Sequence, residues 1–199
     1  DAKLRVEMRR EIKKLHQKLK TTVVYVTHDQ TEAMSLGTNI AIMNHGVIQQ
    51  YDTPENIYNK PNSTFVADFI GSPSMNLVSG QLVKKSNDIS FTPEGSNQSG
   101  NISLKNYNFL KPIQEGSYDV YFGIRPEHIQ YKKTNDTDFE VNLNTDLKEY
   151  IGHEQIITFN YYNQEVLGKF PSTVKIKTGK EMKLFFDLSQ ISIFDKKTN

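Results

Sequence analysis

The first stretch of the chain carries apolar residues at spacings of three and four, which place side chains on one side of a helix. The opposite side is charged and mostly basic. The pattern therefore predicts an amphipathic helix over residues 2–20, with an apolar stripe made of Leu4, Met8, Ile12, Leu15 and Leu19.

A short run of β-branched and aromatic residues follows, with the sequence VVYVT at residues 23–27. The run does not alternate between polar and apolar positions, which is typical of a strand buried on both faces of a parallel sheet. We therefore expect a buried strand here. A short helix is predicted next, over residues 30–36, because Gly37 ends the pattern.

Two apolar runs, at residues 40–43 and 47–50, are separated by Asn44, His45 and Gly46. Short runs joined by such a turn predict a β-hairpin.

Two more short helices are indicated by their starting residues. Thr53 is placed to cap a helix whose first residue is Pro54. Asn62 or Ser63 is placed to cap the other helix, which Gly71 ends.

The pattern changes after Pro73. Helical spacing is lost, and short apolar segments alternate with clusters of Gly, Asn, Asp and Ser. Such segments predict a small β-sandwich or barrel, with a domain boundary at residues 71–76 and an α+β fold overall. The expected strands cover residues 78–83, 118–124, 139–147, 155–161 and 182–186.

Composition excludes several classes of protein. The 199 residues suffice for one large domain or two small ones, and 24 basic against 23 acidic residues argue against a protein built mainly to bind nucleic acid. No apolar run approaches the roughly 20 residues of a membrane span, so we expect no direct membrane insertion. The absence of cysteine excludes disulfides and thiolate zinc sites. Because the chain begins at Asp1 inside a predicted helix, we interpret it as a piece of a longer protein.

The strongest candidate for chemistry is His28, which follows the predicted strand directly. Ligands bind at the carboxyl ends of strands in parallel α/β sheets, so a histidine here is well placed to contact one. The alternative is that His28 caps or packs a loop. We expect no metal site, because the other histidines are scattered without ligand spacing: His16, His45, His128 and His153.

The basic side of the first helix could contact nucleic acid or an anionic membrane. Glu7 and Glu11 interrupt its charge, so we favour a solvated helix face. The chain has neither a GxxxxGK[ST] phosphate loop nor a GxSxG elbow.

The segment GIRPEHI, at residues 123–129, predicts a corner in the chain. Arg125 precedes Pro126 and must be extended, so Glu127 and His128 then project from a turn. The residues alone support a structural corner with an Arg and Glu pair.

Four motifs in order resemble the ATP-hydrolysing subunits of ABC importers of the maltose and multiple-sugar type. VTHDQTEAM at residues 26–34 resembles the family's switch-histidine segment. Residues 46–76 resemble the end of its nucleotide-binding domain, and their GSPSMN ending favours carbohydrate uptake. FGIRPEHI at residues 122–129 and LSQISIFDKKT at residues 188–198 resemble its OB-like (TOBE) regulatory domain.

The resemblance implies roles for two residues. His28 would contact the γ-phosphate of ATP when two ATPase domains close, and Asp1 would be the D-loop aspartate at the dimer interface. The phosphate loop, the glutamine loop, the signature motif and the Walker B glutamate would all lie upstream of Asp1. ATP and Mg²⁺ would thus serve the full-length parent, and we expect this piece alone to use no cofactor and to be inactive.

The resemblance also implies the architecture and the partners. Residues 1–72 would be the C-terminal portion of a RecA-like α/β ATPase domain, and residues 75–199 an all-β OB-like domain with regulatory and dimerisation roles. The parent would hydrolyse ATP at the cytoplasmic face of the membrane, with a second ATPase subunit and permease subunits.

The alternative is a stand-alone OB-type module that binds a small anion, a sugar or an oligonucleotide. Aromatic side chains stack on bases in such modules, and the candidates are Tyr107, Tyr161 and Tyr162. These tyrosines lie among acidic and amide residues and not lysines, so we favour the ATPase subunit.

Overall fold

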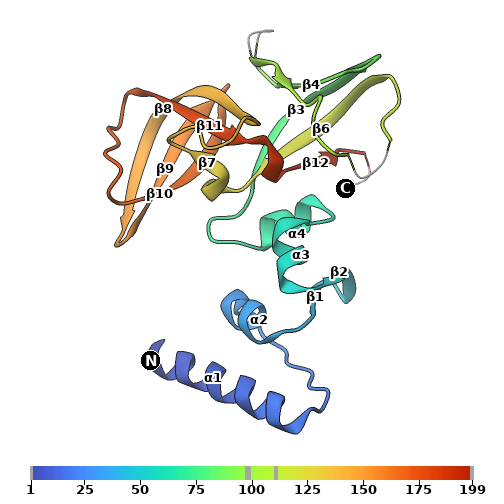
Figure 1. Ribbon diagram of the computed structural model, residues 1–199, viewed down its shortest axis with the longest axis vertical. Coiled ribbons are helices and arrows are strands. Elements are labelled where there is room, and N and C mark those ends of the chain that lie inside the picture. Colours follow the sequence, from blue (N-terminus) through green and yellow to red (C-terminus); the bar gives the residue numbers. More distant parts are fainter. Residues whose placement is uncertain (1, 97–99, 110–111, 198–199) are drawn as a thin grey trace. The chain divides into compact units, whose positions relative to one another are not determined.

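The computed structural model describes residues 2–96, 100–109 and 112–197 (Figure 1). The chain divides into two compact units, Asp1–Asn62 and Ser63–Asn199. This division assigns residues 63–72 to the second unit, whereas the sequence pattern suggested a boundary at residues 71–76; the functional domain bounds stay a prediction.

The described residues of the first unit form three helices and one hairpin. Its described elements are α1 (Ala2–Leu19), α2 (Gln30–Leu36), β1 (Ile40–Asn44), β2 (Val47–Asp52) and α3 (Pro54–Asn59). The predicted helices and hairpin are therefore confirmed. The apolar stripe of α1 is exposed in this chain, and Leu4, Met8, Leu15 and Leu19 each keep more than half of their surface open.

The predicted buried strand at residues 23–27 is wrong. These residues form no strand, and the side chains of Val24 and Val26 are 87% and 91% exposed. A central strand needs hydrogen-bonded neighbours on both sides. The only described strands of this unit are β1 and β2, and they pair with each other.

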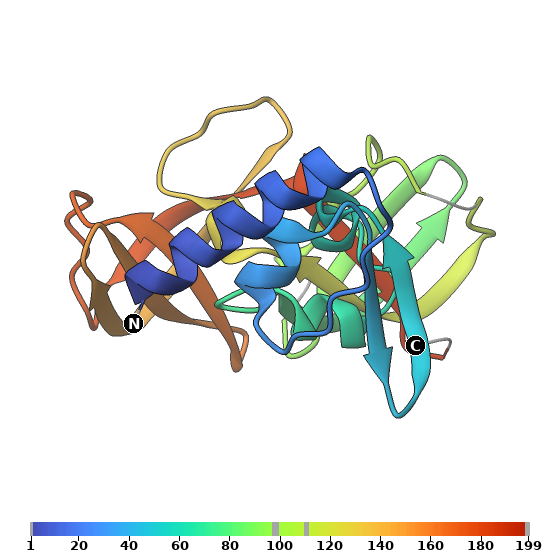
Figure 2. The same cartoon turned by 90° about the horizontal axis from the view of Figure 1, so that it is seen from below.

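Local chemistry explains the confirmed elements. His45 and Gly46, with φ of 47° and 79°, form the two-residue turn between β1 and β2, which Figure 2 shows as adjacent antiparallel arrows. Thr53 Oγ1 accepts a hydrogen bond from the N–H of Asn56 at 3.3 Å and caps α3. Ser63 caps α4 (Thr64–Phe69) in the second unit, which decides between the two predicted caps.

The second unit consists mainly of two five-stranded antiparallel sheets. One sheet has the order β12-β6-β3-β4-β5 and the other β10-β9-β8-β11-β7. All five predicted strands are confirmed, and the structure adds β4, β5, β7, β10 and β12. The bounds are β3 (Asn76–Lys85), β4 (Asp88–Pro93), β5 (Ile102–Ser103), β6 (Gly116–Ile124), β7 (Ile129–Gln130), β8 (Asp138–Ile151), β9 (Glu154–Tyr161), β10 (Gln164–Pro171), β11 (Glu181–Asp187) and β12 (Ile191–Asp195), with 3-10 turns η2 (Pro126–His128) and η3 (Leu188–Gln190).

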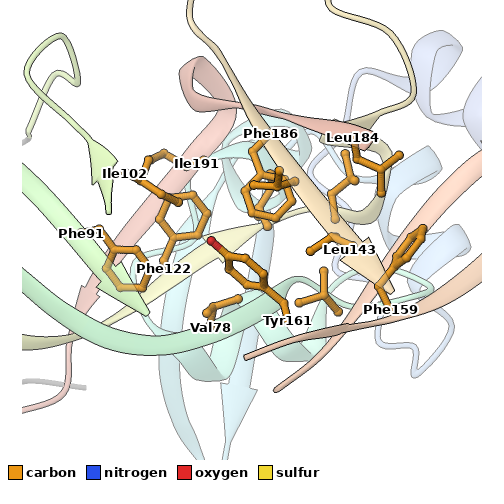
Figure 3. Packing of buried hydrophobic residues seen from close by; sticks show 14 of the residues in the cluster. Val78, Phe91, Ile102, Phe122, Leu143, Phe159, Tyr161, Leu184, Phe186 and Ile191 are labelled. Atoms are coloured by element: carbon orange, nitrogen blue, oxygen red, sulfur yellow. The ribbon is translucent and has the colours of Figure 1, made fainter. Parts of the chain in front are cut away.

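Aromatic rings from both sheets form the core between them (Figure 3). The ring of Phe122 on β6 lies 5.0 Å from that of Phe91 on β4 and 6.1 Å from that of Phe186 on β11. Tyr161 on β9 contacts Phe186 edge-on at 5.6 Å, and its burial raises the pKa of its phenol. Because inward and outward positions alternate along the strands, the two sheets bury one continuous apolar layer.

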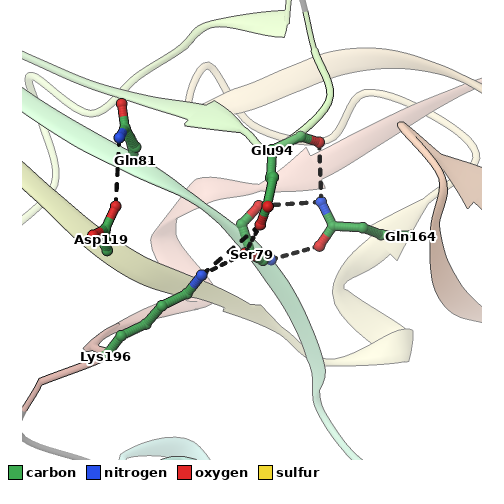
Figure 4. A network of polar contacts seen from close by, with 6 residues as sticks. All are labelled: Ser79, Gln81, Glu94, Asp119, Gln164 and Lys196. Carbon is green, nitrogen blue, oxygen red and sulfur yellow. Dashed lines mark hydrogen bonds and ion pairs between the residues drawn. The ribbon is translucent and has the colours of Figure 1, made fainter.

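Two side-chain amides join the sheets where strands do not pair. The Asn76 amide donates to the carbonyl of Leu167 at 2.9 Å and accepts from the Leu167 N–H at 2.7 Å. The Gln164 amide accepts from the Ser79 N–H at 2.6 Å and donates to the Ser79 carbonyl at 3.1 Å (Figure 4). Lys196, which directly follows β12, donates to the Ser79 hydroxyl at 2.5 Å, so the end of the described chain also contributes to this junction (Figure 4).

The GIRPEHI segment forms a buried corner. Arg125 is extended, with φ −70° and ψ 146°, and a 3-10 turn follows, as predicted. Its side chain is 1% exposed and donates to the carbonyl oxygens of Ala67 and Ile70 at the end of α4. Gly71 has a φ of +115°, and a Cβ there would lie 2.8 Å from Arg125 Nη1. The pairing of Arg125 with Glu127 stays a prediction.

Candidate functional site

His28 lies at the start of α2 with an exposed side chain. The next residue, Asp29, is the N-cap of α2, and its Oδ1 accepts from the N–H groups of Thr31 at 2.8 Å and Glu32 at 3.2 Å. These bonds satisfy two of the free N–H groups at the start of the helix. The backbone just after His28 is therefore fixed, while its imidazole faces solvent.

The residue before His28 is also held. The Thr27 hydroxyl accepts from the Asp29 N–H at 2.9 Å and donates to Glu32 Oε2 at 2.7 Å. The same carboxylate oxygen accepts from the Tyr25 hydroxyl at 3.1 Å. This hydrogen bond is the main cause of a raised pKa at Tyr25.

A hollow of about 300 Å³ in the first unit includes His28. Its lining combines basic and apolar residues of α1 with the segment before α2. The residues are Arg5, Met8, Arg9, Ile12, Tyr25, Thr27, His28, Asp29 and Glu32.

The carboxylate of Asp29 interacts with the positive charges of Arg5 and Arg9 in the lining of this hollow. Its pKa lies below the ordinary value, mainly because the Glu32 N–H donates to the carboxylate, and the Thr31 N–H and the positive charges of Arg9 and Arg5 act in the same direction. Arg5 Nη1 lies 3.8 Å from Asp29 Oδ2. The hollow is therefore lined by two arginines and by two carboxylates, those of Asp29 and Glu32, beside an exposed imidazole, and the formal charges of these side chains cancel.

The remaining candidates from the sequence are not assembled here. Asp1 lies outside the described residues. Across the part of the chain that the structure describes, no three His, Asp or Glu side chains form a group suited to a metal ion. Within the same residues, no helix is both long and apolar enough to cross a membrane.

The tyrosines considered for oligonucleotide stacking do not form an open platform. Tyr161 is 5% exposed in the core, and Tyr162 packs on it with ring centroids 4.8 Å apart. Tyr107 donates to the carbonyl of Ile191 at 3.2 Å, and burial raises its pKa. These rings contribute to packing, so they are not available to stack on bases in this structure.

A second hollow, of about 460 Å³, lies in the second unit over β8, β9 and β10. Its apolar floor is formed by Leu147, Ile156 and Leu167. Its charged lining is acidic, with Asp146, Glu149 and Glu165. The carboxylates disfavour a small anion as its ligand.

The sequence analysis did not predict the hydrogen bonds around Thr27 or the burial of Arg125. One signal was present: Asp29 and Glu32 have the spacing of a capping box, in which the residue at N3 supports the N-cap. The partners of Arg125 lie 55 and 58 residues away along the chain, so no local pattern indicates them.

Comparison with known proteins identifies relatives along the whole chain. Residues 71–129 match the model of the MalK OB fold domain. The chain is 37% identical over 213 residues to the oligosaccharides import ATP-binding protein MsmX of Bacillus subtilis, and 38% identical over 208 residues to the trehalose/maltose import ATP-binding protein MalK of Thermococcus litoralis. Each alignment covers 100% of this chain and 53% of the relative, so the chain spans about half the length of these proteins.

A further relative, the uncharacterized ABC transporter ATP-binding protein YurJ of Bacillus subtilis, is 37% identical over 203 residues, which cover 100% of this chain and 54% of YurJ. Among solved structures, a chain of the cytoplasmic molybdate-binding protein ModG is similar with a TM-score of 0.44 and 10% identity, over 60% of this chain and 95% of that one. A likeness of this size carries no conclusion about a ligand.

Proposed function

This chain belongs to the family of ATP-binding subunits of ABC sugar importers, and on that premise we propose that it is the C-terminal part of a subunit that hydrolyses ATP to energise carbohydrate import. One observation carries the proposal: the chain is 37% and 38% identical, over its full length, to two relatives named for oligosaccharide and trehalose/maltose import. The first unit would be the end of a RecA-like ATPase domain, and the match at residues 71–129 supports an OB-like domain after it.

We propose that His28 donates a hydrogen bond to the γ-phosphate of ATP when two ATPase domains close. An exposed imidazole on a backbone held by hydrogen bonds at Asp29 supports this role. Such a bond would form only in the closed state, and it would couple closure to phosphoryl transfer. Asp1 would act as the D-loop aspartate near the partner subunit's ATP.

ATP and Mg²⁺ are proposed for the full-length subunit. The chain itself has no glycine-rich phosphate loop, and its described residues form no group of three metal-ligating side chains. The residues that the structure describes therefore do not fit a Mg²⁺ site, and His28 would act on a γ-phosphate that other residues hold. By itself the chain is proposed to be inactive.

The second unit is proposed as the regulatory domain through which two subunits associate. The partners would be a second ATPase subunit and the permease subunits, at the cytoplasmic face of the membrane. We propose residues 1–72 and 75–199 as the functional domains. The alternative of a stand-alone OB-type module is weakened by the packed tyrosines and by the acidic lining of the hollow over β8–β10.

The coding sequence that precedes Asp1 tests the proposal. We expect it to encode, in frame, a GxxxxGK[ST] phosphate loop, a signature motif and a Walker B strand that ends in a glutamate close to Asp1. A stop codon directly upstream, or an unrelated domain in place of these motifs, would leave the stand-alone module as the better account.

A further inference from the structure

Three hydrogen bonds form a closed ring among Thr27, Asp29 and Glu32, and the first two of these residues flank His28 in the sequence. The N–H of Glu32 donates to Asp29 Oδ1, the N–H of Asp29 donates to Thr27 Oγ1, and the Thr27 hydroxyl donates to Glu32 Oε2. From this ring we propose that Thr27 and Glu32 are positioning residues that hold His28 for its contact with the γ-phosphate. The inference rests on the proposed function of His28.

The ring differs from an ordinary capping box in one respect. In a capping box, the carboxylate at N3 accepts directly from the N–H of the N-cap residue. Here the hydroxyl of Thr27 stands between Glu32 and the N–H of Asp29, with distances of 2.7 and 2.9 Å. The insertion extends the cap to the residue before His28, so His28 has a fixed neighbour on each side.

Tyr25 holds the same carboxylate. Its hydroxyl donates to Glu32 Oε2 at 3.1 Å, the oxygen that also binds Thr27. Glu32 thus binds the segment before α2 at two residues, Tyr25 and Thr27. This matters because no strand pairing fixes the segment, whose residues 23–26 are exposed in this chain.

The side chains of the ring are themselves half-buried, whereas His28 is exposed. Thr27, Asp29 and Glu32 are each only partly exposed to solvent. Hydrogen bonds to a carboxylate are stronger where water is partly excluded, so the ring can fix the backbone while the imidazole stays accessible. A contact that must form to within a fraction of an ångström in the closed state needs such support.

The ring is tested first by amide hydrogen exchange of this 199-residue chain, read by NMR. Thr27→Val and Glu32→Ala are expected to speed the exchange of the Asp29 N–H about five- to tenfold, the size expected for one lost net hydrogen bond. Glu32→Gln keeps an acceptor oxygen and should stay within about twofold of wild type. Glu32→Ala should also lower the pKa of Tyr25, read from its ring carbon resonance.

Matched controls are Thr22→Val, in the exposed segment before α2, and Glu11→Ala, whose carboxylate pairs with Lys14 on the surface of α1. Both should leave the exchange of the Asp29 N–H unchanged. If Glu32→Ala behaves like these controls, the ring does not hold the backbone and the proposal is overturned, whatever the role of His28.

The role in positioning is tested by ATP turnover of the full-length subunit in its assembled transporter. Thr27→Val and Glu32→Ala should lower kcat about tenfold and change KM for ATP little, and Glu32→Gln should restore most of the rate. If His28→Ala abolishes turnover while Glu32→Ala does not lower it, the positioning role is wrong and the proposed function stands. If His28→Ala itself leaves turnover intact, the proposed function fails, and the positioning role fails with it.

Discussion

Asn76 and Leu167 form two hydrogen bonds, like those between neighbouring residues in a β-ladder. Asn76, however, contributes its side chain and not its backbone. The Asn76 amide donates to and accepts from the main chain of Leu167 at 2.9 and 2.7 Å, and it also donates to the carbonyl of Ile124 at 3.0 Å. Because β3 and β10 belong to different sheets, this amide joins the two layers of the second unit.

Asn76→Ala should therefore destabilise the second unit by about 2–4 kcal/mol, because it leaves the buried carbonyl of Ile124 and the part-buried N–H and carbonyl of Leu167 without this partner. Denaturant unfolding, followed by circular dichroism, measures the loss. The control is Asn144→Ala on the exposed side of β8, which should change the free energy of unfolding by less than about 0.5 kcal/mol. Equal effects from the two variants would show that the amide does not join the sheets.

Arg125→Met should destabilise the same unit by about 2–4 kcal/mol, since two carbonyl groups at the end of α4 lose a buried cationic donor. Cleavage by a protease near residue 71 should also accelerate, because α4 is then held less firmly. Arg10→Met, on the exposed face of α1, serves as the control. An Arg125→Met protein that unfolds and is cleaved like wild type would contradict this role.

The start of α2 should depend on pH through Asp29. Because backbone N–H groups hold the pKa of Asp29 below its ordinary value of 3.8, the cap stabilises α2 fully above that value, and the stabilisation is lost as the pH falls through the lowered pKa. The amide exchange of Glu32 measured between pH 6 and pH 2, and corrected for the intrinsic rate, should show this loss. Asp29→Asn keeps the capping oxygen and should weaken the pH dependence; an undiminished dependence would contradict the assignment.

This chain alone should neither hydrolyse ATP nor bind it tightly, because it has no phosphate loop. Isothermal titration with Mg-ATP should show no binding in the micromolar range, while the full-length subunit binds. Micromolar affinity of the 199-residue chain would mean that this chain itself contains the groups that bind ATP, which would contradict the prediction.

The elements that could be predicted from the sequence are those that depend on nearby residues. The turn at His45 and Gly46 and the caps at Thr53 and Ser63 need only a few residues of context, and all three are confirmed. The long strands of the second unit were likewise indicated by their apolar segments.

The failures depend on distant partners. Val24 and Val26 have the composition of a central strand, but a strand exists only where other strands pair with it, and the described residues of the first unit supply none for them. The burial of Arg125 depends on carbonyl groups of Ala67 and Ile70 far along the chain. For the candidate site, His28 was predicted from its motif, whereas the Thr27 hydroxyl between Asp29 and Glu32 is a matter of geometry that only the structure shows.

The central claim, that His28 acts on the γ-phosphate in an ATPase subunit, is tested most directly by one comparison in the full-length, assembled transporter. ATP turnover and ATP binding are measured for His28→Ala and for the control variant His153→Ala. His153 lies in the second unit, and its side chain is 89% exposed. We predict that His28→Ala lowers turnover by about a hundredfold or more while ATP binding stays near wild type, and that His153→Ala changes neither. Turnover of His28→Ala equal to that of His153→Ala would contradict the claim and leave His28 as a loop residue.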